Sequence, residues 1–272
     1  MSDAVVRVSK DWLALREPAD AAARSRELVE RLSPPAAGSW EIHDLGGGTG
    51  SMGRWLAPLL PGPQRWIVHD RDTDLLALAD FPPTAADGAV VTFETKASDI
   101  TRLQPDDLAG ATLITASALL DMLTEDELAR LVSACAGAGC PSLLCLSVVG
   151  RVALTPADPM DPRVGAAFND HQRRATARGR LLGPDAPGVA AEQFRRLGAE
   201  VLVRSSPWQL GAAHAELAAA WFTGWVRAAF EQQPELLAEA DADAYVRRRL
   251  AQATAGELEV TVDHADLLAL PG

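Results

Sequence analysis

The sequence predicts an α/β fold, built on a doubly wound and mostly parallel sheet with helices on both faces. Over residues 40–150, short apolar segments alternate with segments whose apolar residues recur at helical spacing. The run at residues 142–149 is almost continuously apolar, which is typical of a central parallel strand covered on both faces. The chain has 272 residues, 48% of them hydrophobic, so it is long enough for one domain with a large core.

Two helices are expected before the first strand, over residues 10–32. Apolar residues recur at helical spacing on both sides of Pro18. A proline inside a helix removes a backbone hydrogen bond, so we expect Pro18 to separate the two helices.

A buried strand runs directly into a glycine-rich turn at residues 41–51, E-I-H-D-L-G-G-G-T-G-S. Asp44 stands two positions before the first glycine, Gly46, and the residues after the turn have helical spacing as far as Pro61. A strand, a turn and a helix N-terminus form a concave surface of free backbone N–H groups, where a nucleoside-bearing cofactor can lie against the main chain. A Cβ atom on the turn would obstruct that approach.

A second strand, at residues 65–69, ends at Asp70, about twenty residues after the turn. A carboxylate in this position can accept hydrogen bonds from both ribose hydroxyls of a nucleotide. The arrangement also suits NAD, and residues 48–53 match the dinucleotide pattern G-x-G-x-x-G. The turn and Asp70 alone leave both cofactor classes open.

Additional elements favour one class. The turn has the form D-x-G-x-G-x-G, Ser98-Asp99-Ile100 follows a third strand at residues 90–93, and a fourth strand at residues 112–116 runs into residues 117–121. Together with Asp70, these elements resemble the class I S-adenosylmethionine (SAM)-dependent methyltransferases. The resemblance extends well over residues 40–150 and covers the remainder by architecture only.

The resemblance implies roles for the residues around the turn. Asp44 interacts with the methionine end of SAM, and Asp70 holds the ribose. The glycines that pack against the adenosine and methionine portions are Gly46, Gly47, Gly48 and Gly50. Asp99 accepts from the adenine amino group while Ile100 packs on the ring. The plainer interpretation of Asp70 and Asp99 is that they are helix N-caps.

Other cofactor contacts are implied in the same way. Backbone carbonyls around Ala116 and Ser117 face the ammonium group of SAM. Arg71 departs from the family pattern, which has an apolar residue beside the adenine, although its guanidinium can stack on the base. The N-terminal segment, residues 1–38, is a helical lid over the cleft. On it, Arg24 either approaches the carboxylate of SAM or belongs to a solvated helix face.

The resemblance also sets the expected organisation of a single domain over residues 1–272. After the lid come a cofactor-binding half at 39–150, a substrate-side loop at 151–190, and C-terminal strands at 191–272. Five prolines lie within residues 151–188, so we expect a lid or binding loop there.

The seven-stranded sheet of that family ends in an antiparallel pair, the sixth and seventh strands, at one edge. Here a strand at residues 200–204 and a last strand at 257–262 take these places. The helices expected at residues 213–232 and 234–252 form a two-helix insertion between them.

Methyl transfer is an in-line displacement, so the protein must position the acceptor and, where the acceptor is a hydroxyl, remove its proton. Acceptor contacts are expected at residues 117–123 and 151–180, which follow the fourth and fifth strands. His171 is the first candidate for a general base, because an imidazole can take a proton near neutrality. Asp121 is the second. Both also have plainer interpretations as solvated or packing side chains.

Basic residues gather near His171 although the chain as a whole is acidic. Asp170, Arg173 and Arg174 are candidate substrate-binding residues beside it. The local excess of arginine either attracts an anionic acceptor or pairs with the acidic surface.

Composition limits the possible partners. The formal net charge of −12 and a pI of about 4.8 argue against nucleic acid and anionic membranes as partners. The most apolar stretch, residues 138–154, contains Pro141 and Arg151, so no membrane span is expected. A small-molecule substrate is therefore expected, while the oligomeric state is not indicated.

The cysteines and basic residues indicate the cellular setting. The three cysteines have no further Cys or His at metal-ligand spacing, so we expect no metal site and a reducing, cytoplasmic compartment. Only two of the 25 basic residues are lysines, a bias typical of a high-GC bacterial genome.

The functional hypothesis is methyl transfer from SAM to a small molecule. The accepting atom is an oxygen or nitrogen nucleophile, and the hypothesis includes anionic acceptors. One alternative is an NAD(P)-dependent oxidoreductase, against which stands the lack of a Tyr-x-x-x-Lys pair; the single tyrosine is Tyr245. The other alternative is a SAM-binding but inactive partner subunit.

Overall fold

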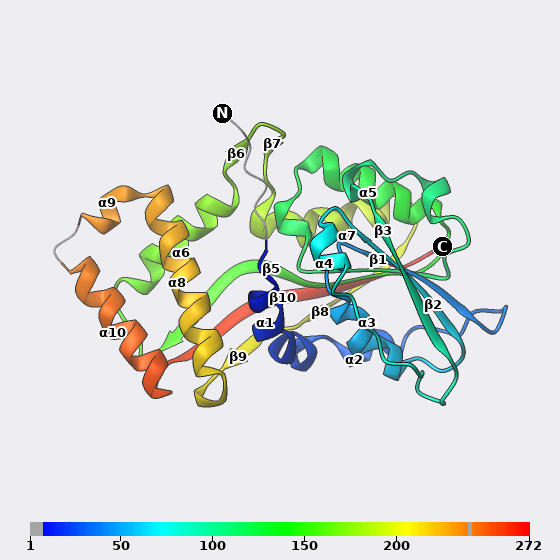
Figure 1. Ribbon diagram of the computed structural model, residues 1–272. Coiled ribbons are helices and arrows are strands. Elements are labelled where there is room, and N and C mark those ends of the chain that lie inside the picture. The colour runs from blue at the N-terminus through cyan, green and yellow to red at the C-terminus, as the bar shows by residue number, and fades with distance from the viewer. Residues whose placement is uncertain (1–7, 239–240) are drawn as a thin grey trace.

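The computed structural model describes residues 8–238 and 241–272 (Figure 1). Along the central sheet, the strands follow the order β3 (Val91–Ala97), β2 (Gln64–Asp70), β1 (Trp40–Leu45), β4 (Leu113–Ser117), β5 (Ser142–Thr155), β10 (Glu259–Leu270) and β8 (Glu200–Ser205). A short strand, β9 (Trp208–Leu210), also pairs with β10.

Strand direction confirms the predicted fold class. β3, β2, β1, β4 and β5 pair in parallel, whereas β10 runs antiparallel to both β5 and β8. The chain builds outward from β1 to β3 and then resumes at β4 on the other side of β1. The topological switch point therefore lies between β1 and β4, where ligands of doubly wound sheets bind.

Helices form three groups around the sheet (Figure 1). One face carries α2 (Arg26–Val29), α3 (Ser51–Leu56) and α4 (Thr73–Leu76). The other carries α5 (Glu125–Gly137) and α7 (Ala186–Arg196). A helical cluster packs on the far ends of β5 and β10 and consists of α6 (Asp161–Gln172), α8 (Ala215–Gln232), α9 (Pro234–Leu237) and α10 (Ala242–Ala255). Helix α1 (Lys10–Ala23) lies against β9 and α8.

Short elements connect these groups. A two-stranded hairpin is formed by β6 (Ala175–Thr176) and β7 (Gly179–Arg180). The 3-10 helices are η1 (Ala57–Leu59), η2 (Ile100–Arg102), η3 (Pro105–Leu108), η4 (Leu120–Met122), η5 (Gly183–Asp185) and η6 (Ala212–His214). Among the helices of the described residues, none has both the length and the hydropathy that crossing a membrane would need.

The first helix continues through Pro18, so the expected break at that residue is wrong. The chain leaves α1 at Arg24 instead, and Ser25 caps α2 by accepting a hydrogen bond from the N–H of Leu28. The N–H of Ser25 donates to the carboxylate of Asp266 at 2.7 Å. A contact with β10, distant in sequence, therefore sets the position of the break.

The segment expected as a substrate-side loop is largely regular structure. β5 continues to Thr155, beyond the expected end at residue 149, because it pairs with β10 over almost its whole length. α6 and the hairpin β6–β7 follow. Over its described residues, the insertion before the last strand contains three α-helices where two helices were expected, and it lies between β9 and β10.

Asp266 is fully buried where the register of β10 against β5 shifts. The N–H of Leu146, whose φ is +56°, donates to this carboxylate at 2.7 Å. The Ser206 hydroxyl donates to it at 2.6 Å, in addition to the N–H of Ser25. One carboxylate thus links the N-terminal helices, β5 and the segment before β9.

Asp266→Ala should lower the free energy of unfolding by about 3 kcal/mol or more, because three buried donors would lose a charged acceptor. Urea denaturation measures the effect. The matched control is Asp263→Ala on the same strand, whose ion pair with the exposed Arg151 should contribute less than about 1 kcal/mol. Equal losses in the two variants would contradict the assignment.

Candidate functional site

The turn between β1 and α3 is fastened to the end of β2. The N–H groups of Gly46 and Gly47 both donate to the carbonyl oxygen of His69, at 2.7 and 3.1 Å. Gly46, Gly48 and Gly50 have φ values of +68°, +53° and +85°, a region that favours glycine. The predicted glycine turn therefore forms at the switch point, and its backbone conformation favours glycine at these three positions.

Asp44 lies directly beneath this turn. A Cβ atom on Gly47 would stand only 2.4 Å from Asp44 Oδ2, so that position has no room for a side chain. The Thr115 hydroxyl of β4 donates to Asp44 Oδ1 at 2.8 Å. Asp44 Oδ2 is buried, and no described residue forms a hydrogen bond with it.

Burial raises the pKa of Asp44 from 3.8 to about 6. The hydrogen bond from Thr115 and the charge of Arg24 act in the opposite direction, while the charge of Asp70 adds to the increase. A buried carboxylate with a free oxygen is costly unless something satisfies it. The free oxygen of Asp44 can therefore bind a hydrogen-bond donor or a positively charged group of a ligand.

Arg24 is only 3% exposed, so the alternative of a solvated helix face is wrong. Its guanidinium donates to the Ser117 hydroxyl at 3.0 Å and to the Ser51 carbonyl oxygen at 3.4 Å. It also lies over the Trp55 ring, 5.5 Å from the centroid. Its buried Nε has no partner among the described residues. The guanidinium of Arg24 therefore places a positive charge between the start of α3 and the end of β4.

Asp70 joins the glycine turn to the segment after β2. The N–H of Gly48 donates to Asp70 Oδ2 at 3.0 Å, and the N–H of Asp72 donates to Oδ1 at 2.9 Å. The N-cap of α4 is Asp72, so the plainer interpretation of Asp70 as a helix cap is wrong. Each carboxylate oxygen can accept a second hydrogen bond, which leaves Asp70 able to bind hydroxyl groups.

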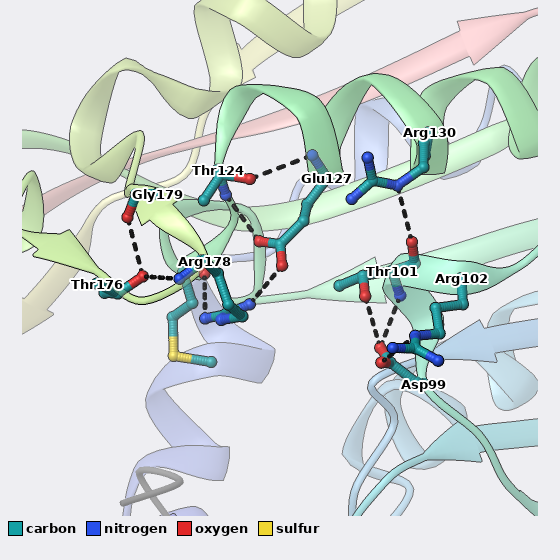
Figure 2. Close-up of polar contacts among 10 residues, drawn as sticks. Asp99, Thr101, Arg102, Thr124, Glu127, Arg130, Thr176, Arg178 and Gly179 are labelled. Carbon is teal, nitrogen blue, oxygen red and sulfur yellow. Dashed lines mark hydrogen bonds and ion pairs between the residues drawn. The ribbon is translucent and has the colours of Figure 1, made fainter. Parts of the chain in front are cut away.

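Asp99 does cap a helix, as its plainer interpretation held. Its carboxylate accepts from the N–H and the hydroxyl of Thr101, at 3.0 and 2.7 Å, and pairs with Arg102 (Figure 2). Partial burial tends to raise the pKa of Asp99, but these partners hold it below its usual value. Ile100 beside it is buried, whereas Arg71 is exposed.

The lid and the end of β4 complete the surroundings of the turn. Leu13 on α1 lies 3.6 Å from the place that a Cβ on Gly48 would occupy, so α1 extends over the turn. Ala116 is buried, and Ser117 binds Arg24. Ala118 follows with a φ of +53°, which is uncommon for a residue with a side chain; residues in such backbone conformations cluster at active sites and ligand-binding positions.

A cavity of about 200 Å³ opens next to Ala118, between α1, α6, β5 and β10. Its aromatic lining comes from four separate elements: Trp12 of α1, Phe168 of α6, Trp208 of β9 and Trp221 of α8. Leu146, the second non-glycine residue with positive φ, also lines it. We refer to this space as the tryptophan-lined cavity.

Asp121 lines the same cavity, after the carboxyl end of β4. Burial raises the pKa of Asp121 from 3.8 to about 6, against the effects of the nearby Arg16 and Arg174. The Gln172 amide is 3.4 Å from its Oδ2. A carboxyl group with a pKa near neutrality in a cavity is a candidate for proton transfer.

The other residues predicted for the acceptor site lie elsewhere. His171 is not among the residues lining the cavity, and its pKa is lowered by burial and by Arg174. Asp170 is exposed, and Arg173 pairs with Asp185 at 2.6 Å. Arg174 donates to the carbonyl oxygen of His171. Of these predicted residues, the structure therefore places Asp121 alone in the cavity lining, although the charge of Arg174 acts on Asp121 from outside it.

Arg178 also has an acidic partner. It pairs with the buried Glu127 at 2.7 Å, and Glu127 forms a capping box with Thr124 at the start of α5 (Figure 2). Together with the Arg173–Asp185 pair, this contact favours the alternative in which the arginines pair with acidic groups.

Several cavity residues could not be recognised from the sequence. Trp12 and Arg16 stand four residues apart, so their spacing places them on one helix face without indicating what that face contacts. Trp208 and His264 enter the cavity only because β9 and β10 pair, and no local pattern marks that pairing.

Comparison with known proteins adds structural neighbours only, since no family model and no curated protein matches the chain. The cyclopropane synthase MmaA2 from Mycobacterium tuberculosis is 13% identical, with 96% of this chain and 94% of that chain covered and a TM-score of 0.49. A SAM-dependent methyltransferase from Geobacter sulfurreducens, in complex with S-adenosyl-L-homocysteine, is 15% identical, with 97% and 92% covered and a TM-score of 0.39. The assignment of the fold therefore rests on the observed strand order and not on these similarities.

Asp44→Asn should change how stability depends on pH. The raised pKa means that Asp44 favours the folded state while protonated, and this contribution is lost as the pH rises through about 6. Asparagine does not ionise. Relative to wild type, the free energy of unfolding of the variant should therefore be roughly 1–3 kcal/mol higher, which means a more stable fold, at pH 7.5 than at pH 4.5.

Urea denaturation at the two pH values measures this difference. Asp170→Asn, at an exposed carboxylate, is the matched control and should show parallel profiles. A parallel profile for Asp44→Asn would contradict the raised pKa.

Proposed function

We propose that this protein binds SAM and transfers its methyl group to a small-molecule acceptor. The observation that carries the proposal is a buried pair of opposite charges beside the glycine turn, Asp44 and Arg24, each with a polar atom that no described residue satisfies. The methionine end of SAM has an ammonium and a carboxylate group. A ligand of that kind supplies a partner to both side chains.

The remaining positions fit the nucleoside of the same cofactor. Asp70 has acceptor capacity left for ribose hydroxyls. Ile100 offers an apolar surface to the adenine, and the carboxylate of Asp99 lies next to it. The glycine turn allows the cofactor to approach the main chain closely.

The buried charge pair also separates SAM from NAD. NAD has no ammonium group for the free oxygen of Asp44, whereas SAM has an ammonium for Asp44 and a carboxylate for Arg24. No specific feature of the described residues favours the oxidoreductase. A SAM-binding but inactive partner subunit would have the same cofactor site and would differ only in not methylating an acceptor.

When bound, SAM would supply an activated methyl group and a neutral leaving group. The chain must orient the acceptor and accept its proton. We assign proton transfer to Asp121 because it lines the tryptophan-lined cavity and His171 does not. Positioning falls to the aromatic side chains around it.

Asp70→Ala should weaken SAM binding by roughly 1–3 kcal/mol, because the ribose hydroxyls would lose a charged acceptor and the turn would lose its link to β2. Isothermal titration calorimetry with SAM, S-adenosylhomocysteine and NADH measures this. Wild type should bind the first two and not NADH.

The matched control is Asp126→Ala, an exposed carboxylate on α5 whose removal should leave SAM affinity unchanged. Binding of NADH in place of SAM would support the oxidoreductase instead. SAM binding without turnover of any acceptor in a metabolite screen would support the inactive subunit.

A further inference from the structure

The cations of the tryptophan-lined cavity already have acidic partners. Arg16 forms two hydrogen bonds with Asp20, at 2.9 and 3.2 Å, and lies over the Trp208 ring. Arg151 is 75% exposed and pairs with Asp263 at 2.8 Å. An anionic group in the cavity would have to compete with these carboxylates.

The uncompensated groups in the cavity are hydrogen-bond acceptors. Asp121 accepts a hydrogen bond from its own backbone N–H and one from the Gln172 amide, the latter at 3.4 Å. That orientation leaves Gln172 Oε1 buried and without a partner among the described residues. His264 is 4% exposed, and burial lowers its pKa to about 4. Its Nδ1 has no partner among the described residues and is an acceptor in the tautomer that carries the proton on Nε2. His264 is therefore neutral at pH 7.

Aromatic faces complete the lining. Trp12 and Trp208 lie with their ring centroids 6.4 Å apart, tilted by 57°, and Trp221 and Phe168 line the cavity from the helical cluster. Indole and phenyl faces attract cations and pack well against apolar groups. The guanidinium of Arg16, 4.9 Å from the Trp208 centroid, already uses one of these faces in this way.

We propose that the acceptor is a small apolar amine, whose body packs against the aromatic lining and whose nitrogen faces Asp121 and Gln172. An ammonium group provides several N–H donors for the free acceptor atoms, together with the charge that a carboxylate and aromatic faces attract. The cavity of about 200 Å³ is smaller than the roughly 300–1,000 Å³ typical of drug-sized ligands, which limits the amine to a small one. The proposal rests on the proposed methyl transfer.

The step balances with the groups present. The bound ammonium gives one proton to the Asp121 carboxylate, which frees the lone pair on nitrogen. The N–C bond then forms as the C–S bond of SAM breaks, and sulfur keeps the electron pair as a neutral thioether. The product is the methylated ammonium, and the proton on Asp121 passes to solvent.

The test compares three probes of similar shape, phenethylamine, 2-phenylethanol and 3-phenylpropionate, by calorimetry in the presence of S-adenosylhomocysteine. Wild type should bind the amine at least tenfold more tightly than the alcohol, and the carboxylate least tightly. Asp121→Asn should remove the preference for the amine. Asp126→Asn, at an exposed carboxylate on α5, should retain it.

A pH series gives a second measurement that needs no variant. Phenethylamine stays protonated at both pH 7.5 and pH 5, whereas Asp121 takes up a proton between them. The amine should therefore bind at least several-fold more weakly at pH 5. The charged and titratable groups around Asp121 are Arg16, Arg174, His264 and Asp263, and of these His264 titrates below this range.

Equal or tighter binding of the carboxylate, an unchanged preference in a folded Asp121→Asn, or no binding of any probe would overturn the proposal. SAM titration without a probe keeps the two proposals separate. If SAM binds and the amine preference is absent, only the acceptor class is wrong. If SAM does not bind, the methyl-transfer proposal itself fails.

Discussion

The antiparallel pairing of β5 with β10 is the constraint on which the rest of the structure depends. This pairing ends the parallel part of the sheet at β5. The far ends of both strands extend beyond the sheet and pack against the helical cluster. Where its register shifts, the buried Asp266 satisfies the N–H of Leu146 and also fixes the start of α2 through Ser25. The same ribbon therefore sets the path of the lid, the strained backbone of the cavity wall and the position of the helices opposite.

The cavity exists because two separate cores meet along this ribbon. The sheet contributes the backbone near Ala118, and the helical cluster contributes aromatic side chains such as Phe168 and Trp221. Both arginines in the lining pair with a carboxylate nearby, Arg16 with Asp20 and Arg151 with Asp263. What remains unpaired is acceptor atoms, and that imbalance, more than the net charge of the chain, indicates what the cavity binds.

The sequence predicts well the features that neighbouring residues determine. The glycine turn, Asp70 after β2 and the parallel half of the sheet depend on local spacing, and all are found where expected. The break after α1, the length of β5 and the position of Trp208 depend on pairing with β10, which no local pattern encodes. The sequence places His171 and Gln172 side by side on a helix, but only tertiary packing decides which of them lines the cavity.

Two of the three glycines in the literal match to G-x-G-x-x-G are explained by packing. A Cβ on Gly50 would lie 2.7 Å from the Phe81 ring, and one on Gly53 would overlap that ring at 1.8 Å. Both glycines therefore make room for a core side chain and carry no information about a pyrophosphate. The residue that favours SAM in our proposal lies beneath the turn: Asp44 accepts from Thr115, and its second, buried oxygen has no partner among the described residues, so the ammonium group of SAM would supply one. The glycine pattern permits either cofactor, and the buried charges select between them.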